Sequence, residues 1–230
     1  MVVTEIFKSI EGEGKRTGKI CTFIRLFGCN LLCSYCDSLY SVTKEQCVQS
    51  VNMSISEIVD KCKEFKTPYV TVTGGEPLIH KDIENLILEL VNNDFEVNIE
   101  TNGSVDISKV RNYVHNNTLV DKWNHLFFTV DYKSISSNCS SQMLDINFTE
   151  NLWARDVVKF VVGTDEDLDD MKKVVSTIRN HCDCQIFVSP IFGMIEPKYI
   201  VEYIKNNDMF DVRMQLQIHK FIWPSDMKGV

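Results

Sequence analysis

The stretch of sequence that decides the fold is residues 28–38, Gly-Cys-Asn-Leu-Leu-Cys-Ser-Tyr-Cys-Asp-Ser. Cys29, Cys33 and Cys36 have the spacing C-x3-C-x2-C, so that one tight loop can direct three thiolates at one point. A closed structural zinc site uses four protein ligands, and most iron–sulfur carriers also use four cysteines. Three cysteines therefore leave one coordination position for a ligand that is not protein, and Tyr35 places an aromatic ring beside that position.

The composition is that of a globular protein with a buried core. The chain has 230 residues, with 44% hydrophobic and 24% charged residues, which is enough for one large domain covering residues 1–230. A formal net charge of −8 argues against a nucleic-acid-binding surface. The sequence has no run of about 18 apolar residues, so we expect no membrane span. The amino-terminal residues lack the layout of a signal peptide, and we expect a cytoplasmic protein.

Cysteine usage points to metal chemistry rather than to disulfide bonds. The chain has nine cysteines, an odd number, without a secretory signal. Metal ligation by some of them, with the others as free thiols, is the interpretation we favour.

The order of the expected elements indicates an α/β fold. Strands that alternate with helices predict a parallel sheet with right-handed crossovers. The units are too few for eight strands and eight helices, so we expect a partial, open barrel of the TIM type. The expected strands are 2–10, 20–27, 69–73, 95–100, 126–130, 157–162, 185–188 and 212–218, and the expected helices are 54–66, 80–92, 106–115, 147–153, 166–181 and 197–206.

The chemically distinctive residues follow the carboxyl ends of these strands. Sites in parallel α/β folds lie at those ends, so we expect one face of the barrel to collect them. They are Cys29, Gly74-Gly75-Glu76-Pro77, Glu100-Thr101-Asn102-Gly103, Asp131-Tyr132-Lys133, Ser189 and His219.

The cysteine loop resembles the cluster loop of the radical S-adenosylmethionine (SAM) superfamily, which has the pattern C-x3-C-x2-aromatic-C. The resemblance implies that three thiolates hold a four-iron, four-sulfur (4Fe-4S) cluster and that SAM binds the open iron. Electron transfer into the sulfonium then gives a deoxyadenosyl radical, while the protein supplies binding and orientation. Residues 74–77 resemble the Gly-Gly-Glu-Pro element that contacts SAM, although a plain strand-to-helix turn is the alternative.

A second resemblance covers most of the chain and is to the 7-carboxy-7-deazaguanine synthase family. It rests on the order of six segments. These are Lys8-Ser9-Ile10-Glu11-Gly12-Glu13-Gly14, Phe23 to Leu31, Cys36-Asp37-Ser38, Thr73 to Pro77, Glu100 to Gly103 and Gln217-Ile218-His219-Lys220.

This resemblance implies a lyase of queuosine and deazapurine biosynthesis. The reaction converts 6-carboxy-5,6,7,8-tetrahydropterin to 7-carboxy-7-deazaguanine by radical ring contraction with loss of ammonia. The enzyme is a homodimer that regenerates SAM, is assisted by magnesium, and takes its electron from an external donor such as flavodoxin or ferredoxin.

The resemblance also implies roles for individual residues. Ser38 resembles the hydroxyl that ligates magnesium. The residues that resemble substrate contacts are Ile10, Glu11, Glu13, Arg25, Thr73, His219 and the terminal Val230. Those that resemble SAM contacts are Tyr35, Gly74, Gly75, Glu76, Thr101, Asn102, Asp131, Lys133 and Ser189.

Chemistry agrees with several of these roles, and simpler interpretations stand beside them. An arginine can pair bidentately with a substrate carboxylate, whereas Arg25 at a strand edge would need no ligand. Ser38 fits a hard cation that takes oxygen ligands, or is a turn serine. His219 is a substrate contact or a histidine packed at a strand end.

The chain departs from the family pattern at three places. Glu11 stands where many members have glutamine, Asp131-Tyr132-Lys133 replaces Ser-Pro-Lys, and the tail after His219 is longer than in the shortest members.

Two other functions compete with this one. A glycyl-radical activase shares the cysteine spacing and the small size but acts on a protein. A non-catalytic zinc or iron–sulfur protein would need a fourth ligand, for which His80 or His125 are candidates without useful spacing.

Overall fold

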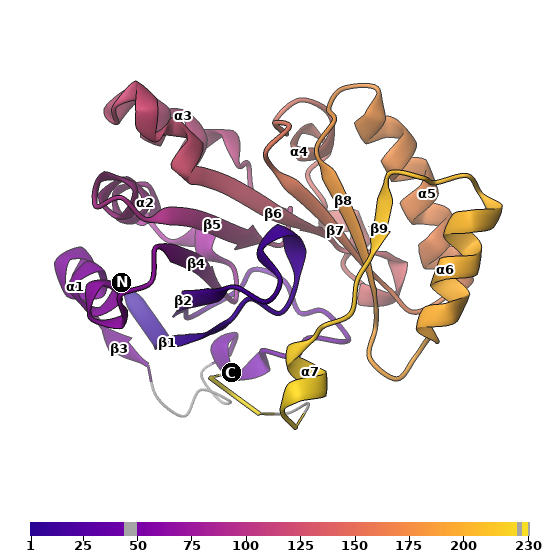
Figure 1. The fold of residues 1–230 in the computed structure, drawn as a ribbon, viewed down its shortest axis with the longest axis horizontal. Helices are drawn as coiled ribbons and strands as arrows, with labels where there is room; N and C mark the ends of the chain where they lie inside the picture. Colours follow the sequence, from indigo (N-terminus) through magenta and orange to yellow (C-terminus); the bar gives the residue numbers. More distant parts are fainter. Residues whose placement is uncertain (44–49, 225–226, 230) are drawn as a thin grey trace.

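The computed structural model describes residues 1–43, 50–224 and 227–229, which form one mixed sheet with helices on its outer face (Figure 1). The sheet has nine strands in the order β3-β1-β2-β4-β5-β6-β7-β8-β9. The strands are β1 (Val2–Ile10), β2 (Ile20–Leu26), β3 (Val51–Asn52), β4 (Tyr69–Gly74), β5 (Glu96–Thr101), β6 (Leu126–Tyr132), β7 (Val157–Val162), β8 (Gln185–Pro190) and β9 (Val212–Met214). The α-helices are α1 (Ile55–Phe65), α2 (Ile83–Asn92), α3 (Ser108–Asn117), α4 (Ile146–Thr149), α5 (Asp165–Arg179), α6 (Pro197–Asn206) and α7 (His219–Ile222).

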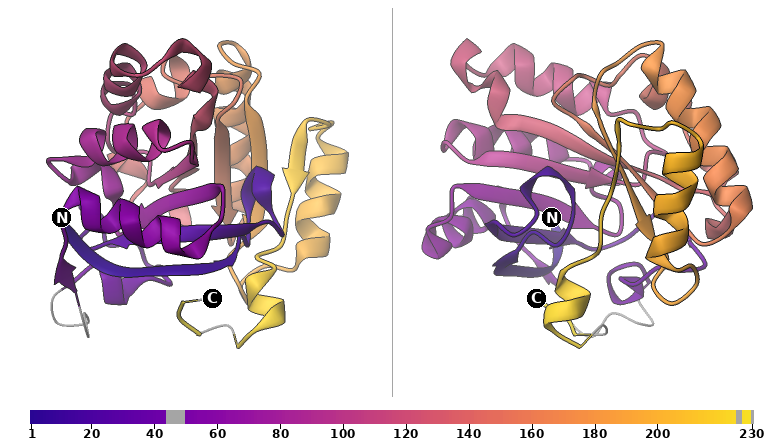
Figure 2. Two further views of the ribbon diagram at one scale, coloured as in Figure 1. Left: turned by 60° about the vertical axis from the view of Figure 1, so that its left-hand side comes forward. Right: turned by 45° about the vertical axis from the view of Figure 1, so that its right-hand side comes forward.

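The sheet is an open barrel, as the sequence predicts. From β2 through β9 every neighbouring pair of strands is parallel. The order of hydrogen-bonded strands ends at β3 on one side and at β9 on the other, so the described strands do not close a ring. Figure 2 shows from two further sides that the strands curve around a common interior and that α1, α2, α3, α5 and α6 lie outside them.

Local sequence signals account for the helix boundaries. Ser54 accepts a hydrogen bond from the backbone of Glu57, and Glu57 accepts one from Ser54, which is a complete capping box at the start of α1. Thr164 and Asp167 form the same arrangement at α5. The expected helix 80–92 begins later, at Ile83, because Pro77–Ile79 forms a separate 3₁₀ turn.

Two parts of the sheet differ from the simple parallel alternation. β1 runs antiparallel to β2, because the short connection between them cannot make the long crossover that parallel strands need. The last strand ends at Met214 instead of Ile218. The chain leaves the sheet there, and Ile218 N donates to Gly12 O at 3.2 Å, so that His219 opens α7 instead of following a strand.

The two faces of the strands have different characters. Alternate residues point to opposite faces of a strand, and those facing the helices form one apolar core that includes Val72, Ile99, Phe128, Phe160 and Val188. The residues between them face the interior of the barrel and are largely polar; those that line its cavity are Thr73, Glu100, Thr129, Asp131 and Lys159. The fold thus places a polar surface inside the barrel.

The turn between β1 and β2 closes the interior at the amino ends of the strands. It contains the 3₁₀ turn η1 (Gly14–Arg16). Arg16 is only 3% exposed and donates to Glu96 O at 2.9 Å, to Thr71 Oγ1 at 2.6 Å and to Glu11 Oε2 at 3.2 Å. A buried charge needs such partners. The turn therefore fixes one end of the interior and leaves the carboxyl end open for a site.

Candidate active site

One cavity of about 260 Å³ lies inside the barrel toward the carboxyl ends of the strands. It brings together most of the residues that the sequence singles out, as expected for a parallel α/β fold. The expected residues that line it are Ile10, Glu11, Glu13, Arg25, Cys29, Cys33, Tyr35, Cys36, Ser38, Thr73, Gly74, Gly75, Thr101, Asn102, Asp131, Lys133 and His219. Glu76 and Ser189 do not line it, and Val230 lies outside the described residues.

The cysteine loop lies at one end of the cavity and is held by neighbouring loops. Cys29 Sγ accepts hydrogen bonds from Leu31 N at 3.4 Å and from Asn102 Nδ2 at 3.7 Å. Ser34 N donates to Ser137 O at 3.0 Å. Burial raises the pKa of all three thiols, that of Cys33 to about 12. Thiols in such a site exchange their protons for metal when it binds.

The donor set fits a cluster better than a single ion. Within the described ranges, no three His, Cys, Asp or Glu side chains are grouped so that they could hold one metal ion. Thiolates that each bind a different iron of a cluster need a wider spacing. Neither His80 nor His125 lines the cavity, so neither of these histidines supplies the fourth ligand that a zinc site at these cysteines would need.

Two buried polar atoms beside the cysteines have no hydrogen-bond partner in the structure. They are the Tyr35 hydroxyl and Asp131 Oδ1, and both residues line the cavity. Because buried polar groups are nearly always paired, these atoms are suited to a polar ligand. The residues present therefore fit a cofactor such as SAM next to the cysteines.

Gly74 and Gly75 allow β4 to pass close to the end of β2. A β-carbon on Gly74 would lie 2.3 Å from Leu26 O, and one on Gly75 would lie 2.2 Å from Gly28 O and 2.9 Å from Cys29 Cβ. The resemblance implies that these glycines contact SAM, and glycine permits such a close approach of the backbone. The approach that the structure shows is to the cysteine loop itself, so the two glycines also fix where that loop begins.

Glu76 points away from the cavity into the protein. It is fully buried and accepts hydrogen bonds from Leu78 N at 3.0 Å, Thr101 Oγ1 at 2.8 Å and Asn102 N at 2.7 Å. It holds in place the loop after β5, whose residues Thr101 and Asn102 do line the cavity. In this arrangement the Glu76 carboxylate contacts the loop of Thr101 and Asn102.

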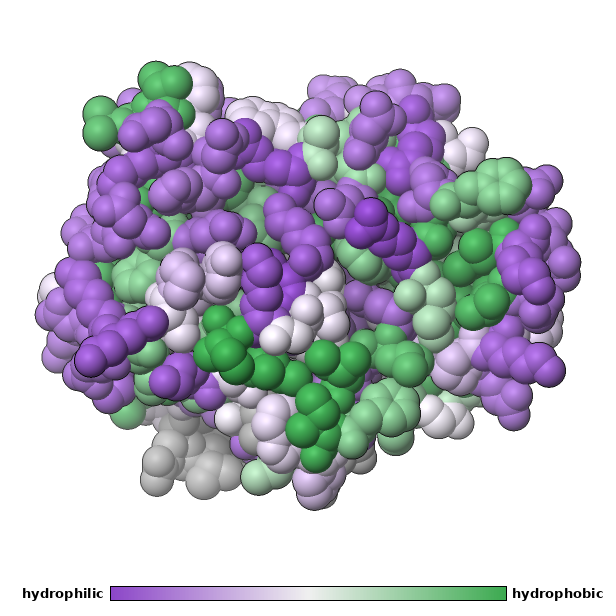
Figure 3. All heavy atoms as spheres, viewed as in Figure 1, coloured by the Kyte–Doolittle hydropathy of each residue, from purple (hydrophilic) through white to green (hydrophobic). Residues whose placement is uncertain are grey.

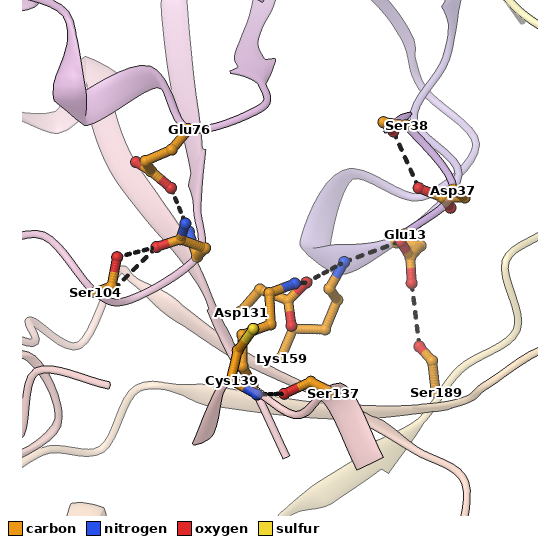
Figure 4. A network of polar contacts seen from close by, with 12 residues as sticks. Glu13, Asp37, Ser38, Glu76, Ser104, Asp131, Ser137, Cys139, Lys159 and Ser189 are labelled. Carbon is orange, nitrogen blue, oxygen red and sulfur yellow. Dashed lines mark hydrogen bonds and ion pairs between the residues drawn. The ribbon is translucent and has the colours of Figure 1, made fainter. Parts of the chain in front are cut away.

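A row of charges crosses the middle of the cavity. Lys133 Nζ lies 2.9 Å from Asp131 Oδ2. Lys159 Nζ lies 3.4 Å from the same oxygen and 3.1 Å from Glu13 Oε2 (Figure 4). Ser189 is buried behind this row and donates to Glu13 Oε1 at 3.1 Å. Burial raises the pKa of Asp131, but Lys133 and Lys159 outweigh it and hold that pKa below its usual range.

Arg25 has a partner inside the protein, which explains how a charged residue can interrupt an apolar strand. Its Nε donates to Glu5 Oε1 at 2.8 Å, and Tyr40 donates to the same oxygen at 2.7 Å. Its Nη1 lies 3.5 Å from Ser38 Oγ, which in turn donates to Asp37 Oδ1 at 3.0 Å. Glu5 thus fixes one edge of the guanidinium while Arg25 and Ser38 both line the cavity.

His219 closes the cavity from the α7 side. A β-carbon on Gly12 would lie 2.0 Å from His219 Nδ1, so the imidazole rests directly on the turn that carries Glu11 and Glu13. Burial lowers the pKa of His219 despite the nearby Glu13. Lys220, next along α7, pairs with Asp37 at 3.4 Å, so the carboxyl-terminal segment is tied to the cysteine loop.

Sequence reasoning missed several residues of the cavity. Glu100 and Lys220 belong to motifs named above but have no role there, and Lys159 belongs to none of these motifs, yet all three line the cavity. Burial, with Glu11 and Glu13 nearby, raises the pKa of Glu100 to about 7. A signal for Lys159 was available, since it is the one charged residue in the strand VVKFVV.

Comparisons with known proteins agree with this arrangement. The radical SAM superfamily model matches residues 23–135. The 7-carboxy-7-deazaguanine synthase of Clostridium acetobutylicum is 38% identical over 229 residues, which are 99% of this chain and 98% of that protein. The chain belongs to the 7-carboxy-7-deazaguanine synthase family. Another member of this family, from Methanospirillum hungatei, is 39% identical, and the match covers 96% of this chain and 85% of that protein.

Solved structures support the same fold for this member of the 7-carboxy-7-deazaguanine synthase family. QueE from Escherichia coli matches with a TM-score of 0.70 at 20% identity, over 94% of this chain and 92% of that chain. Streptococcus suis SuiB bound to S-adenosylmethionine matches with a TM-score of 0.56 over 84% of this chain and 46% of that chain. These structural matches establish the fold, and the expected open barrel is confirmed.

Proposed function

We propose that this chain is a radical SAM lyase that converts 6-carboxy-5,6,7,8-tetrahydropterin to 7-carboxy-7-deazaguanine and ammonia. Its membership of the 7-carboxy-7-deazaguanine synthase family supports this reaction. The observation that carries it is that Cys29, Cys33 and Cys36 line the same cavity as Arg25, Glu13 and His219. One site thus combines thiolates for a cofactor with charged side chains for a small charged substrate.

The first part of the proposal concerns the cofactors. Cys29, Cys33 and Cys36 hold the 4Fe-4S cluster, and when bound the cluster supplies the electron that cleaves SAM. Tyr35, Asn102, Asp131 and Lys133 contact SAM, with support from the unpaired Tyr35 hydroxyl and Asp131 Oδ1. Gly74, Gly75 and Thr101 complete the wall on that side. Glu76 and Ser189 act from behind the wall through Asn102 and Glu13.

The second part concerns the substrate. Arg25, with its Nε fixed by Glu5, presents its guanidinium to the substrate carboxylate, which it can bind bidentately. Glu13 and Glu11 accept hydrogen bonds from the N–H groups of the pterin edge. Ile10, Thr73 and His219 complete the pocket from β1, β4 and α7. Ser38 provides an oxygen ligand for magnesium beside the carboxylate, and Val230 is proposed as a further substrate contact.

Further features of the protein belong to the same proposal. One continuous sheet supports treating residues 1–230 as a single radical SAM domain. Figure 3 shows apolar surface over the region of α7, where Phe221 and Ile222 are exposed. Such patches mark protein contacts, which supports a homodimer. We propose an external electron donor such as flavodoxin or ferredoxin, and the cytoplasm as the compartment, because reduced thiols persist there.

No helix in the described part of the chain is long and apolar enough to cross a membrane.

The glycyl-radical activase alternative is disfavoured because a lyase of this family, not an activase, matches the chain over nearly its full length.

Anaerobic reconstitution with iron and sulfide tests the proposal. The reconstituted protein should absorb at roughly 400 nm, as iron–sulfur clusters do. It should also form the ring-contracted product from carboxytetrahydropterin, SAM and a reductant. Cys33→Ala should lose the absorbance and the turnover together, while Cys182→Ala, a cysteine outside the cavity, should keep both. A cluster-loaded protein that gives no ring-contracted product would contradict the substrate assignment but not the cluster.

A further inference from the structure

Lys159 is a buried cation in the centre of the active-site cavity. It lies on β7 with Val158 and Phe160 on either side, and it is 9% exposed. Val158 and Phe160 face the helices in the apolar core, so Lys159 faces the barrel interior. A lysine ammonium is strongly hydrated, so its burial here requires partners that replace water.

Those partners are carboxylates from two parts of the chain that are far apart in sequence. Lys159 Nζ lies 3.1 Å from Glu13 Oε2, in the turn between β1 and β2. It lies 3.4 Å from Asp131 Oδ2 on β6, where Asp131 and Lys159 are direct partners in the strand register. Figure 4 shows the ammonium between the two carboxylates. Lys159 therefore joins the turn of Glu13 to the strand of Asp131.

The two carboxylates serve different proposed ligands. Glu13 receives a second hydrogen bond from Ser189 and lies in the turn against which His219 rests. Asp131 receives a second contact from Lys133, and its other oxygen is buried without a partner beside Tyr35. One cation thus orients a group on the substrate side and a group on the SAM side.

The charge balance shows why Lys159 stays protonated and why its loss would matter. Burial lowers the pKa of Lys159, but Asp131, Glu13 and Glu100 outweigh that effect and hold the pKa well above its ordinary value. Without the ammonium, these three carboxylates would face one another in a buried space. Like charges in such a space repel strongly, so Glu13 and Asp131 would move apart.

We propose that Lys159 is a positioning residue that holds Glu13 for the substrate and Asp131 for SAM, and thereby couples the binding of the two. The proposal rests on the proposed function for the identity of the substrate. A coupling between two sites is reciprocal, so substrate should tighten SAM binding and SAM should tighten substrate binding to the same degree.

The experiment measures the dissociation constant of SAM in cluster-loaded protein without reductant, with and without carboxytetrahydropterin. Lys159→Met should weaken SAM binding by roughly ten-fold or more, the effect of losing hydrogen bonds to a charged group, and should remove the tightening by substrate. Lys159→Arg, which keeps the charge, should restore part of both effects. In turnover, Lys159→Met should raise KM for both ligands.

Arg111→Met is the matched control. Arg111 is also a buried cation, paired with Asp156 at 2.6 Å, but neither residue lines the cavity. This variant should lower the denaturant midpoint and leave the SAM dissociation constant unchanged. If Lys159→Met fails to fold, the double variant with Lys159→Met and Glu13→Gln takes its place, because it removes one uncompensated carboxylate. This double variant should still bind SAM more weakly than Glu13→Gln alone.

The proposal is overturned if the dissociation constants of Lys159→Met for SAM and for substrate are both within about two-fold of the wild type. Substitutions that remove no specific interaction usually have effects of that size. Where carboxytetrahydropterin tightens SAM binding in the wild type, the proposal is also overturned if Lys159→Met changes only one of the two affinities. Failure of the proposed function looks different: the wild type itself would then show no effect of carboxytetrahydropterin on SAM binding, while Lys159→Met would still weaken SAM binding.

Discussion

The imidazole of His219 rests on the α-carbon of Gly12, so closely that a β-carbon on Gly12 would lie 2.0 Å from His219 Nδ1. The contact joins residues at opposite ends of the chain, and the hydrogen bond from Ile218 N to Gly12 O, 3.2 Å long, stands beside it. The glycine in the turn Glu11-Gly12-Glu13 is therefore needed for the histidine to reach the cavity.

Gly12→Ala should displace His219 and raise KM for the pterin by about ten-fold, because overpacking costs about 1–3 kcal/mol. Steady-state kinetics checks the change. In a His219→Ala background the added methyl group meets no imidazole, so Gly12→Ala should have little further effect. Additive losses in the double variant would show that Gly12 acts through something other than His219.

Arg25→Ala should raise KM for the pterin by about 10- to 100-fold, since a hydrogen bond to a charged group contributes about 1.5–3 kcal/mol. Arg25→Lys should recover little, because an ammonium lacks the bidentate geometry of a guanidinium. Unchanged turnover and affinity in Arg25→Ala would leave Arg25 as a structural partner of Glu5 only.

Ser38→Ala should abolish the stimulation of turnover by magnesium while leaving the cluster absorbance intact. The Ser38 hydroxyl lies between Asp37 and Arg25 on the cavity wall, where an oxygen ligand suits a hard cation. Magnesium titrations of the wild type and the variant provide the comparison. Full stimulation in the variant would remove Ser38 from the magnesium site.

Arg16→Met should lower the free energy of unfolding by about 3–5 kcal/mol, the usual effect of removing one partner of a buried ion pair. Glu11 would remain in the interior, 3% exposed and without its cation. Urea denaturation measures the loss, and adding Glu11→Gln should recover part of it. A small loss in Arg16→Met alone would contradict this role of the buried ion pair.

Glu100 predicts a pH dependence of stability. Burial is the main reason that its pKa rises from 4.5 to about 7 in the folded protein. Between these values the folded state binds more protons than the unfolded state, so this contribution to stability is present below about pH 4.5 and is lost as the pH rises through about 7. Glu100→Gln should flatten the curve of denaturant midpoint against pH over that interval, and an unaltered slope would contradict the assignment.

Much of the fold follows from local sequence. β7 and α6 have the expected bounds, and the capping box at Ser54 and Glu57 marks the start of α1. The position of the site also follows, because residues after parallel strands meet at one end of a sheet. The predicted strand 212–218 is wrong in its extent, since β9 ends at Met214, and the antiparallel direction of β1 does not follow from the alternation of strands and helices. Both depend on where the turn at Gly12 and the segment before His219 meet.

By itself, the sequence determined the chemistry of this protein: the spacing of Cys29, Cys33 and Cys36 specifies three thiolates on one loop, whatever surrounds them. Only the tertiary structure decided which charges face one another. Glu76 turns inward, and Lys159 lies between Glu13 and Asp131. Spacing along a chain is local, whereas the pairing of buried charges depends on strands that are brought together by folding and on the removal of water from between them.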